Sequence, residues 1–168
     1  LIHVISLTLE EAYLGNEAYN INISKNISGK RENESIYIEI PEGVDNDEVI
    51  LLRSRGHENN GVKGDIKIKF KVSNSTQFTR DGMNLTYSKD ITLKEALCGF
   101  SFELPFFKNK KYKISNEIGN IVKPGYIKEI CGMGIKRNNQ IGRLFIKFNI
   151  TFPEELSEKK IEELNSIL

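Results

Sequence analysis

Cysteine and histidine are scarce in this 168-residue chain, which contains only two of each. They stand at positions 3, 57, 98 and 131, a spacing that matches no zinc site, so we predict no metal. Cys98 and Cys131 do not belong to a set of regularly spaced cysteines of the kind that marks a disulfide-rich domain. A disulfide between them is therefore poorly supported. We interpret both cysteines as small buried hydrophobes in a reducing compartment.

An excess of either charge is missing too. The chain has 24 lysines and arginines against 23 aspartates and glutamates, which gives a net charge of +1. Since nucleic-acid binding is driven by clustered positive charge, near neutrality predicts no nucleic-acid partner. No apolar run approaches the roughly 20 residues that a membrane-spanning helix needs, so we also predict no membrane partner.

Motifs of catalysis are absent as well. The chain contains no Gly-x-Ser-x-Gly, no Walker phosphate loop and no His-Glu-x-x-His. The carboxylate pairs Glu10-Glu11 and Glu154-Glu155 stand at predicted helix starts, where negative charge suits the helix dipole. We therefore predict that the chain is not an enzyme and uses no cofactor.

The chain does contain an internal repeat. Three blocks recur in the same order: Leu7–Gly15 as Ile91–Gly99, Ile40–Gly43 as Val122–Gly125, and Gly64–Val72 as Gly142–Ile150. An ordered recurrence of this kind indicates two copies of one small module.

Most of the chain is predicted to form strands. Several stretches alternate apolar and polar residues at period two, the pattern of a strand with one face on a core and one in water. The residues predicted to point inward are Ile21 and Ile23; Ile36, Ile38 and Ile40; Ile66, Ile68, Phe70 and Val72; and Leu144, Ile146, Phe148 and Ile150. Turn sequences at Asn59–Gly61, Arg80–Gly82 and Asn138-Asn139 separate strands.

Each copy also carries one short predicted helix. Both helices begin with the spacing of a capping box, in which a threonine and a glutamate satisfy the first backbone N–H groups. The pairs are Thr8 with Glu11 and Thr92 with Glu95, and the glycines that end the helices are Gly15 and Gly99.

The last segment has a different pattern. Ser157 is placed as an N-cap, and Ile161, Leu164 and Leu168 fall at i, i+3 and i+7 on one face of a predicted helix. Such a helix either docks on its own domain or contacts a second copy of the chain, and the spacing alone leaves both open.

Six segments, in order along essentially the whole chain, resemble the C-terminal substrate-binding region of DnaJ-type co-chaperones. They are Ile5–Gly15, Ile40–Gly43, Phe78–Gly82, Leu93–Gly99, Lys123–Gly125 and Gly142–Pro153. The resemblance implies two tandem β-sandwich-like domains at 1–75 and 76–153, each with a short helix. A C-terminal dimerisation helix would follow at 154–168.

The resemblance also indicates the class of co-chaperone. Ser24–Glu34 is interpreted as an ordinary polar loop where class A members carry a Cys-x-x-Cys-x-Gly-x-Gly zinc region, so the chain resembles class B. The His-Pro-Asp tripeptide of the J-domain is absent, and the chain begins in mid-pattern like an excised fragment. The resemblance implies a piece that holds unfolded clients for a seventy-kilodalton heat-shock chaperone and forms a homodimer.

The abundance of isoleucine, lysine and asparagine is typical of an AT-rich genome such as that of an apicomplexan parasite. We expect a cytosolic protein, and export to a host-cell cytosol is an alternative if the source is a parasite.

By motif position, the resemblance implies a shallow client-binding groove in the first domain. Its walls would be formed by His3, Ile5, Tyr19, Ile21, Ile23 and Ile68. Plain core packing is the competing interpretation for each isoleucine. The dimer contact would be formed by Leu156, Ile161, Leu164 and Leu168.

One departure from the family bears on the partner chaperone. Many relatives place lysines along the second strand, where they clamp the partner's acidic tail, but Glu17–Ile23 has no lysine and one inserted residue. Each lost charge-assisted contact costs about 1.5–3 kcal/mol. We therefore expect weak or absent binding of a Glu-Glu-Val-Asp tail, with Lys25 as a partial substitute.

Two alternatives to a client-binding module stay open. One is an architectural dimerisation module whose groove is closed. The other is a different repeated β-sandwich, such as a carbohydrate-binding module, which the absence of tryptophan disfavours because sugar platforms need aromatic faces.

Overall fold

The computed structural model describes residues 1–168, the whole chain. Strands hold 56% of the residues and helices 13%, which confirms the predicted mainly β fold. The chain divides into two compact units, of which the first comprises residues 1–87 and 129–145 and the second residues 88–128 and 146–168. The domain bounds that the resemblance implies, 1–75, 76–153 and 154–168, stay a prediction.

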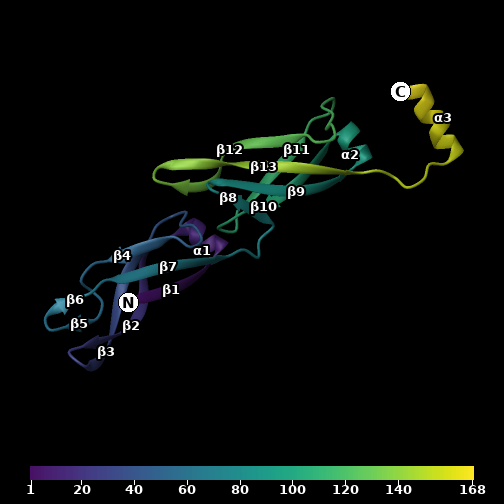
Figure 1. Ribbon diagram of the computed structural model, residues 1–168. Coiled ribbons are helices and arrows are strands. Elements are labelled where there is room, and N and C mark those ends of the chain that lie inside the picture. Colours follow the sequence, from purple (N-terminus) through teal and green to yellow (C-terminus); the bar gives the residue numbers. More distant parts are fainter. The chain divides into compact units, whose positions relative to one another are not determined.

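The first unit contains two sheets that enclose a core (Figure 1). Its elements begin with β1 (Ile2–Thr8), α1 (Leu9–Leu14), β2 (Asn16–Ile27), β3 (Lys30–Ile40), β4 (Val49–Leu52), β5 (Glu58–Asn59), β6 (Val62–Lys63), β7 (Ile66–Ser73) and β8 (Phe78–Asp81). One sheet has the order β1-β7-β4, with β1 parallel to β7, and the other has the order β3-β2-β5-β6.

The core of the first unit contains the residues that the period-two pattern predicted to point inward, together with Ile5, Leu7, Ala12 and Val44, for which the pattern made no prediction. Its buried members are Ile5, Leu7, Ala12, Ile21, Ile23, Ile36, Ile38, Ile40, Val44, Ile66, Ile68 and Phe70. Val72, at the end of β7, is partly buried against the same cluster.

The remaining elements are β9 (Asn84–Thr92), α2 (Leu93–Cys98), β10 (Phe100–Pro105), β11 (Lys111–Asn116), β12 (Ile127–Arg137), β13 (Gln140–Thr151) and α3 (Glu158–Ile167). β10 pairs with β11 in one sheet, and β8 joins β9, β12 and β13 in another sheet of order β12-β13-β9-β8. Leu144, Ile146 and Phe148 are buried as predicted, and Ile150 is half-buried. None of the helices is long and apolar enough to cross a membrane.

Both predicted capping boxes are present. The amide of Glu11 donates to Thr8 Oγ1 at 3.2 Å, and the amide of Thr8 donates to Glu11 Oε2 at 2.8 Å. Thr92 and Glu95 repeat this arrangement at the start of α2. Gly15 ends α1 with a φ of 64°, and a Cβ there would lie 2.7 Å from the Ile40 carbonyl oxygen, so only glycine fits.

The prediction of a polar loop at Ser24–Glu34 is wrong. These residues continue the β2–β3 hairpin, which stays paired as far as Ile27 and Lys30. Ser28 and Gly29 turn the chain with φ values of 49° and 86°, the positive angles that a tight hairpin turn requires. Most side chains at this end face water or are only partly covered, so the period-two signal is lost although the backbone pairing continues.

The interpretation of the two cysteines as buried is also wrong, since both are free and exposed. Cys98 is the last residue of α2, whose one buried side chain is that of Ala96. Cys131 faces water from β12, where burial is limited to Gly134 and Ile135. A cysteine side chain tolerates burial but does not require it, so its position within the helix or strand determines whether it is buried.

Candidate functional site

The residues predicted to wall a groove lie on β1, β2 and β7. Ile5, Ile21, Ile23 and Ile68 all belong to the core cluster, and each exposes no more than 4% of its surface. Their side chains fill the space between the two sheets of the first unit. A direct contact between these four isoleucines and a peptide stays a prediction.

The other two predicted residues are half-buried. His3 pairs with Ile68 in the register of β1 and β7. Tyr19 packs against the core cluster and lines a cavity of about 200 Å³ together with Leu7 and Leu14. Tyr19 therefore borders both the core and an accessible hollow.

A β-bulge lies directly before Tyr19. Asn16 pairs with Ile40 and Tyr19 pairs with Ile38, so β2 holds one residue more than β3 over this stretch. The side-chain Oδ1 of Asn16 accepts a hydrogen bond from the amide of Ala18 at 2.9 Å, which holds the bulge. A bulge re-aims the side chains that follow it, and here it accommodates the extra residue of β2 relative to β3.

Two strand edges next to this region are free. β1 has β7 as its one neighbour, and β2 pairs with β5 only at Ile27. Unpaired backbone N–H and C=O groups along an edge are a template for a further strand. The arrangement can therefore accept an extended peptide by adding it to a sheet.

The one lysine of β2 is occupied. Lys25 Nζ lies 2.5 Å from Glu34 Oε2, with 15% of its side chain exposed, and Arg55 contacts the other oxygen of Glu34 at 3.3 Å. The hydrogen bond from Lys25 is the main cause of a lowered pKa for Glu34. Glu34 thus stays charged below the ordinary pKa of a glutamate, and Lys25 stays paired at neutral pH.

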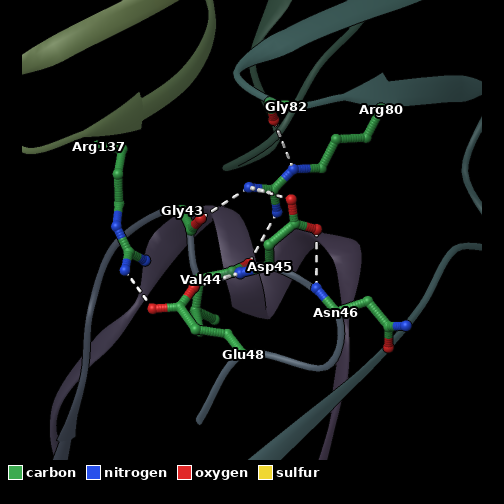
Figure 2. A network of polar contacts seen from close by, with 8 residues as sticks. All are labelled: Gly43, Val44, Asp45, Asn46, Glu48, Arg80, Gly82 and Arg137. Atoms are coloured by element: carbon green, nitrogen blue, oxygen red, sulfur yellow. Dashed lines mark hydrogen bonds and ion pairs between the residues drawn. The ribbon is translucent and has the colours of Figure 1, made fainter. Parts of the chain in front are cut away.

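Arg80, from the Arg-Asp-Gly turn, clamps the loop that follows β3 (Figure 2). Its Nη1 and Nη2 donate to the carbonyl oxygens of Val44 and Gly43 at 2.7 Å each, and its Nε donates to the Gly82 carbonyl at 2.9 Å. Only 10% of the side chain is exposed. Burial lowers the pKa of Arg80 from its usual value, and the charge of nearby Asp45 opposes that shift.

A second arginine reaches the same loop. Arg137, at the end of β12, donates from Nη2 to Glu48 Oε1 (Figure 2). Its Nη1 is buried and has no hydrogen-bond partner. The loop from Gly43 to Glu48 is thereby held by cations from β8 and β12, both distant in sequence.

The second unit carries an apolar groove of about 470 Å³. Its lining residues come from the end of β9, from α2, from the end of β13 and the two residues after it, and from α3: Thr92, Leu93, Lys94, Leu97, Cys98, Thr151, Phe152, Pro153 and Leu164. Leu97 is 39% exposed and Phe152 61% exposed. The groove is large enough to receive several aliphatic side chains.

Helix α3 begins as predicted, with the amide of Lys160 donating to Ser157 Oγ at 3.4 Å. None of its residues is buried. The predicted dimer residues Leu156, Ile161, Leu164 and Leu168 are 42%, 46%, 38% and 90% exposed. A ten-residue helix with an uncovered apolar stripe has little stability of its own and needs a surface to pack on.

Sequence reasoning missed two sets of residues. From the sequence, Arg80 was predicted only to be part of a turn, because nothing in the sequence indicates that it binds carbonyl groups 36 and 37 residues away. The groove residues Leu93 and Leu97 could have been found from the sequence, because they stand at i and i+4 and so share one face of the predicted helix. In the structure the buried residue of this helix is Ala96, which leaves that face uncovered.

Comparison with known proteins gives a consistent result. The family model described as the DnaJ C terminal domain matches residues 1–153. A protein from Dictyostelium discoideum named "DnaJ homolog subfamily A member 1 homolog" is 32% identical over 150 residues, which cover 86% of this chain and 33% of that protein. "Chaperone protein DnaJ" from Staphylococcus saprophyticus is 34% identical over 142 residues, covering 80% of this chain and 36% of that protein. The chain thus spans about a third of the length of these curated relatives.

Proposed function

Because the chain belongs to the DnaJ C-terminal domain family, we propose that it is the client-holding and dimerising part of a DnaJ-type co-chaperone. In this role it binds non-native polypeptides in the first unit, forms a homodimer through α3 and holds its clients for a seventy-kilodalton heat-shock chaperone. The free edges of β1 and β2 beside the hollow at Tyr19 carry this proposal.

Client binding follows from the chemistry of a strand edge. Backbone hydrogen bonds along β1 or β2 would accept an extended segment of almost any sequence, and the hollow beside Tyr19 would favour an apolar side chain. Binding of this kind needs no catalytic group, in keeping with a family of non-enzymatic chaperones.

A class B protein is the proposed subtype. The turn at Ser28-Gly29 closes the β2–β3 hairpin directly, and the chain has too few cysteines for a zinc region. A cytosolic location, with export to a host-cell cytosol as the alternative, belongs to the same proposal.

Replacing Tyr19 by serine is expected to weaken the protection of clients roughly twofold, because it removes the aromatic wall of the hollow. The measurement is light scattering of a chemically unfolded model protein that aggregates in the presence of the chain. Tyr37→Ser is the matched control, since Tyr37 is 70% exposed on β3 and lies outside the hollow.

An equal loss in both tyrosine variants would place client binding elsewhere. No protection even by the unaltered chain would favour the architectural alternative, a dimerisation module without client binding. The burial of Ile21 and Ile68 favours that alternative, because these side chains offer a client no surface unless the sheets separate. Aspartate at either position would unfold the core and so test nothing.

Docking of an acidic Glu-Glu-Val-Asp tail on β2 is expected to be weak or absent, because Lys25 is already paired with Glu34. In an NMR titration at a peptide concentration of about 1 mM, the amide signals of Ile21 and Ile23 should stay in place, as binding weaker than this corresponds to less than about 4 kcal/mol. Salt-sensitive shifts of those signals at micromolar peptide would contradict the prediction.

A further inference from the structure

The sheet β1-β7-β4 has a second face that points away from the core. Along β7, Ile66, Ile68 and Phe70 are buried, so Lys67, Lys69 and Lys71 point outward. Strand pairing puts Ile2 and Leu51 beside Lys67. It likewise puts Val4 and Val49 beside Lys69, and Ser6 beside Lys71. We call this surface, formed by Ile2, Val4, Val49, Leu51, Lys67, Lys69 and Lys71, the lysine face.

The lysine face combines exposed aliphatic side chains with a row of cations. Ile2, Val4, Val49 and Leu51 are 70%, 51%, 50% and 44% exposed. They lie on the two edge strands and flank the lysines of the central strand on both sides. Lys67 is exposed and forms no ion pair. A row of cations between two aliphatic borders is complementary to a surface that is acidic along its centre and aliphatic on its flanks.

The chain itself shows that a carboxylate fits this row. Asp47 Oδ1 lies 2.9 Å from Lys69 Nζ and 2.5 Å from Lys71 Nζ. The hydrogen bonds from Lys71 and Lys69 lower the pKa of Asp47 to about 2. Lys67 and Lys69 repeat the spacing of Lys69 and Lys71 one step along the strand, and no carboxylate of the chain pairs with Lys67.

We propose that the lysine face binds an acidic amphipathic helix of a partner protein. Three strands about 4.8 Å apart span about the 10–12 Å diameter of a helix, so a helix laid along β7 covers all three strands. Its carboxylates would lie over Lys67 and Lys69, and its flanking aliphatic side chains over the residues of β1 and β4. This surface is the outer face of the sheet and not its hydrogen-bonding edge at β1, so the inference does not depend on the proposed function.

Other anionic partners fit the lysine face less well. The face has no aromatic ring on which a nucleic-acid base could stack. Two of its three lysines, Lys69 and Lys71, already share one aspartate, and the chain's net charge is only +1, which is too little for a polyphosphate or an anionic membrane. A protein surface can instead present carboxylates between aliphatic side chains, and complementary charge of this kind gives an interface its specificity.

The test is fluorescence anisotropy with a labelled 18-residue helical peptide that carries glutamates along one stripe and leucines on both sides of it. The unaltered 168-residue chain should bind this peptide, and a version with glutamine for glutamate should bind at least about tenfold more weakly. Lys67→Glu should weaken binding by a similar factor. Lys30→Glu, the same charge change at an exposed position on β3, should weaken it less than about twofold.

NMR provides the location, since the signals of Val4 and Leu51 should shift while those of Ile21 and Ile23 should not. Circular dichroism confirms that each variant is folded, and Lys67→Gln replaces Lys67→Glu if the latter is not. Equal losses in the Lys67 and Lys30 variants, or no binding by the unaltered chain, would overturn the proposal. So would Lys67-dependent binding to phosphatidylglycerol vesicles without binding to the peptide.

Discussion

Replacing Arg80 by methionine is expected to lower the free energy of unfolding of the first unit by about 3 kcal/mol, because each hydrogen bond from a charged donor contributes about 1.5–3 kcal/mol. Methionine keeps an apolar stem of similar length but donates nothing. The carbonyl groups of Gly43 and Val44, which now accept at 2.7 Å, would lose their donors. The measurement is urea denaturation followed by circular dichroism.

Arg143→Met provides the matched control. Arg143 forms an ion pair with Glu129 at 2.6 Å, but 56% of its side chain is exposed. Exposed pairs of this kind contribute about 0–1 kcal/mol, so the control should be nearly neutral. If both substitutions lowered the free energy of unfolding equally, the hydrogen bonds of Arg80 would contribute no more to stability than an exposed ion pair does.

The physical reason for the contrast is the geometry of the guanidinium. Its planar fork reaches two adjacent carbonyl groups and a third in its own turn, which an ammonium cannot do. Arg80→Lys should therefore lose most of the same stability although it keeps the charge. The Arg-Asp-Gly segment thus acts as a clamp on the loop from Gly43 to Glu48, and not only as a turn.

Removing α3 by ending the chain after Pro153 is expected to convert a homodimer into a monomer. All residues of the helix are at least partly exposed, and the groove lined by Leu93, Leu97 and Phe152 offers an apolar surface that a partner's helix could cover. One pair of short helices buries a small area, so the intact dimer should dissociate in the micromolar range, about 8 kcal/mol. Sedimentation equilibrium should then return the mass of a single chain for the truncated form.

A point variant tests the same contact without shortening the chain. Leu164→Asp puts a charge into the groove and should raise the dissociation constant by about a hundredfold, as expected for a buried anchor residue. Ile118→Asp is the matched control, because Ile118 is 92% exposed in the second unit and lies outside the groove. A dimer that survives both truncation and Leu164→Asp would show that α3 is not the contact.

The elements themselves could be predicted because their signals are local. The capping boxes at Thr8 and Thr92 span three residues, and their hydrogen bonds form within the same turn. The period-two pattern likewise identified the buried face of β7. The hairpin end at Ser24–Glu34 escaped because its pairing is made by the backbone, and polar side chains there carry no inward–outward contrast.

The candidate site was less predictable, and Ile21 and Tyr19 show why. Alternation indicates that Ile21 points inward, but it cannot tell a groove wall from a core residue, and the structure buries Ile21 to 4% exposure. Tyr19 borders a hollow only because a bulge re-aims it and because Leu7 and Leu14 lie nearby. Burial depends on what covers a residue from elsewhere in the chain.

Patterns in the amino-acid sequence were enough to identify the repeated β module, both capped helices, the apolar stripe of α3 and, through its motifs, the family. Each of these depends on residues within a few positions of one another or on blocks that recur in order. Three-dimensional packing sets what surrounds them: the carbonyl partners of Arg80, the pairing of Lys25 with Glu34, the groove beside α3 and the row of lysines between aliphatic borders. Each of these features brings together residues from different strands, loops or helices, and no short-range pattern carries that information.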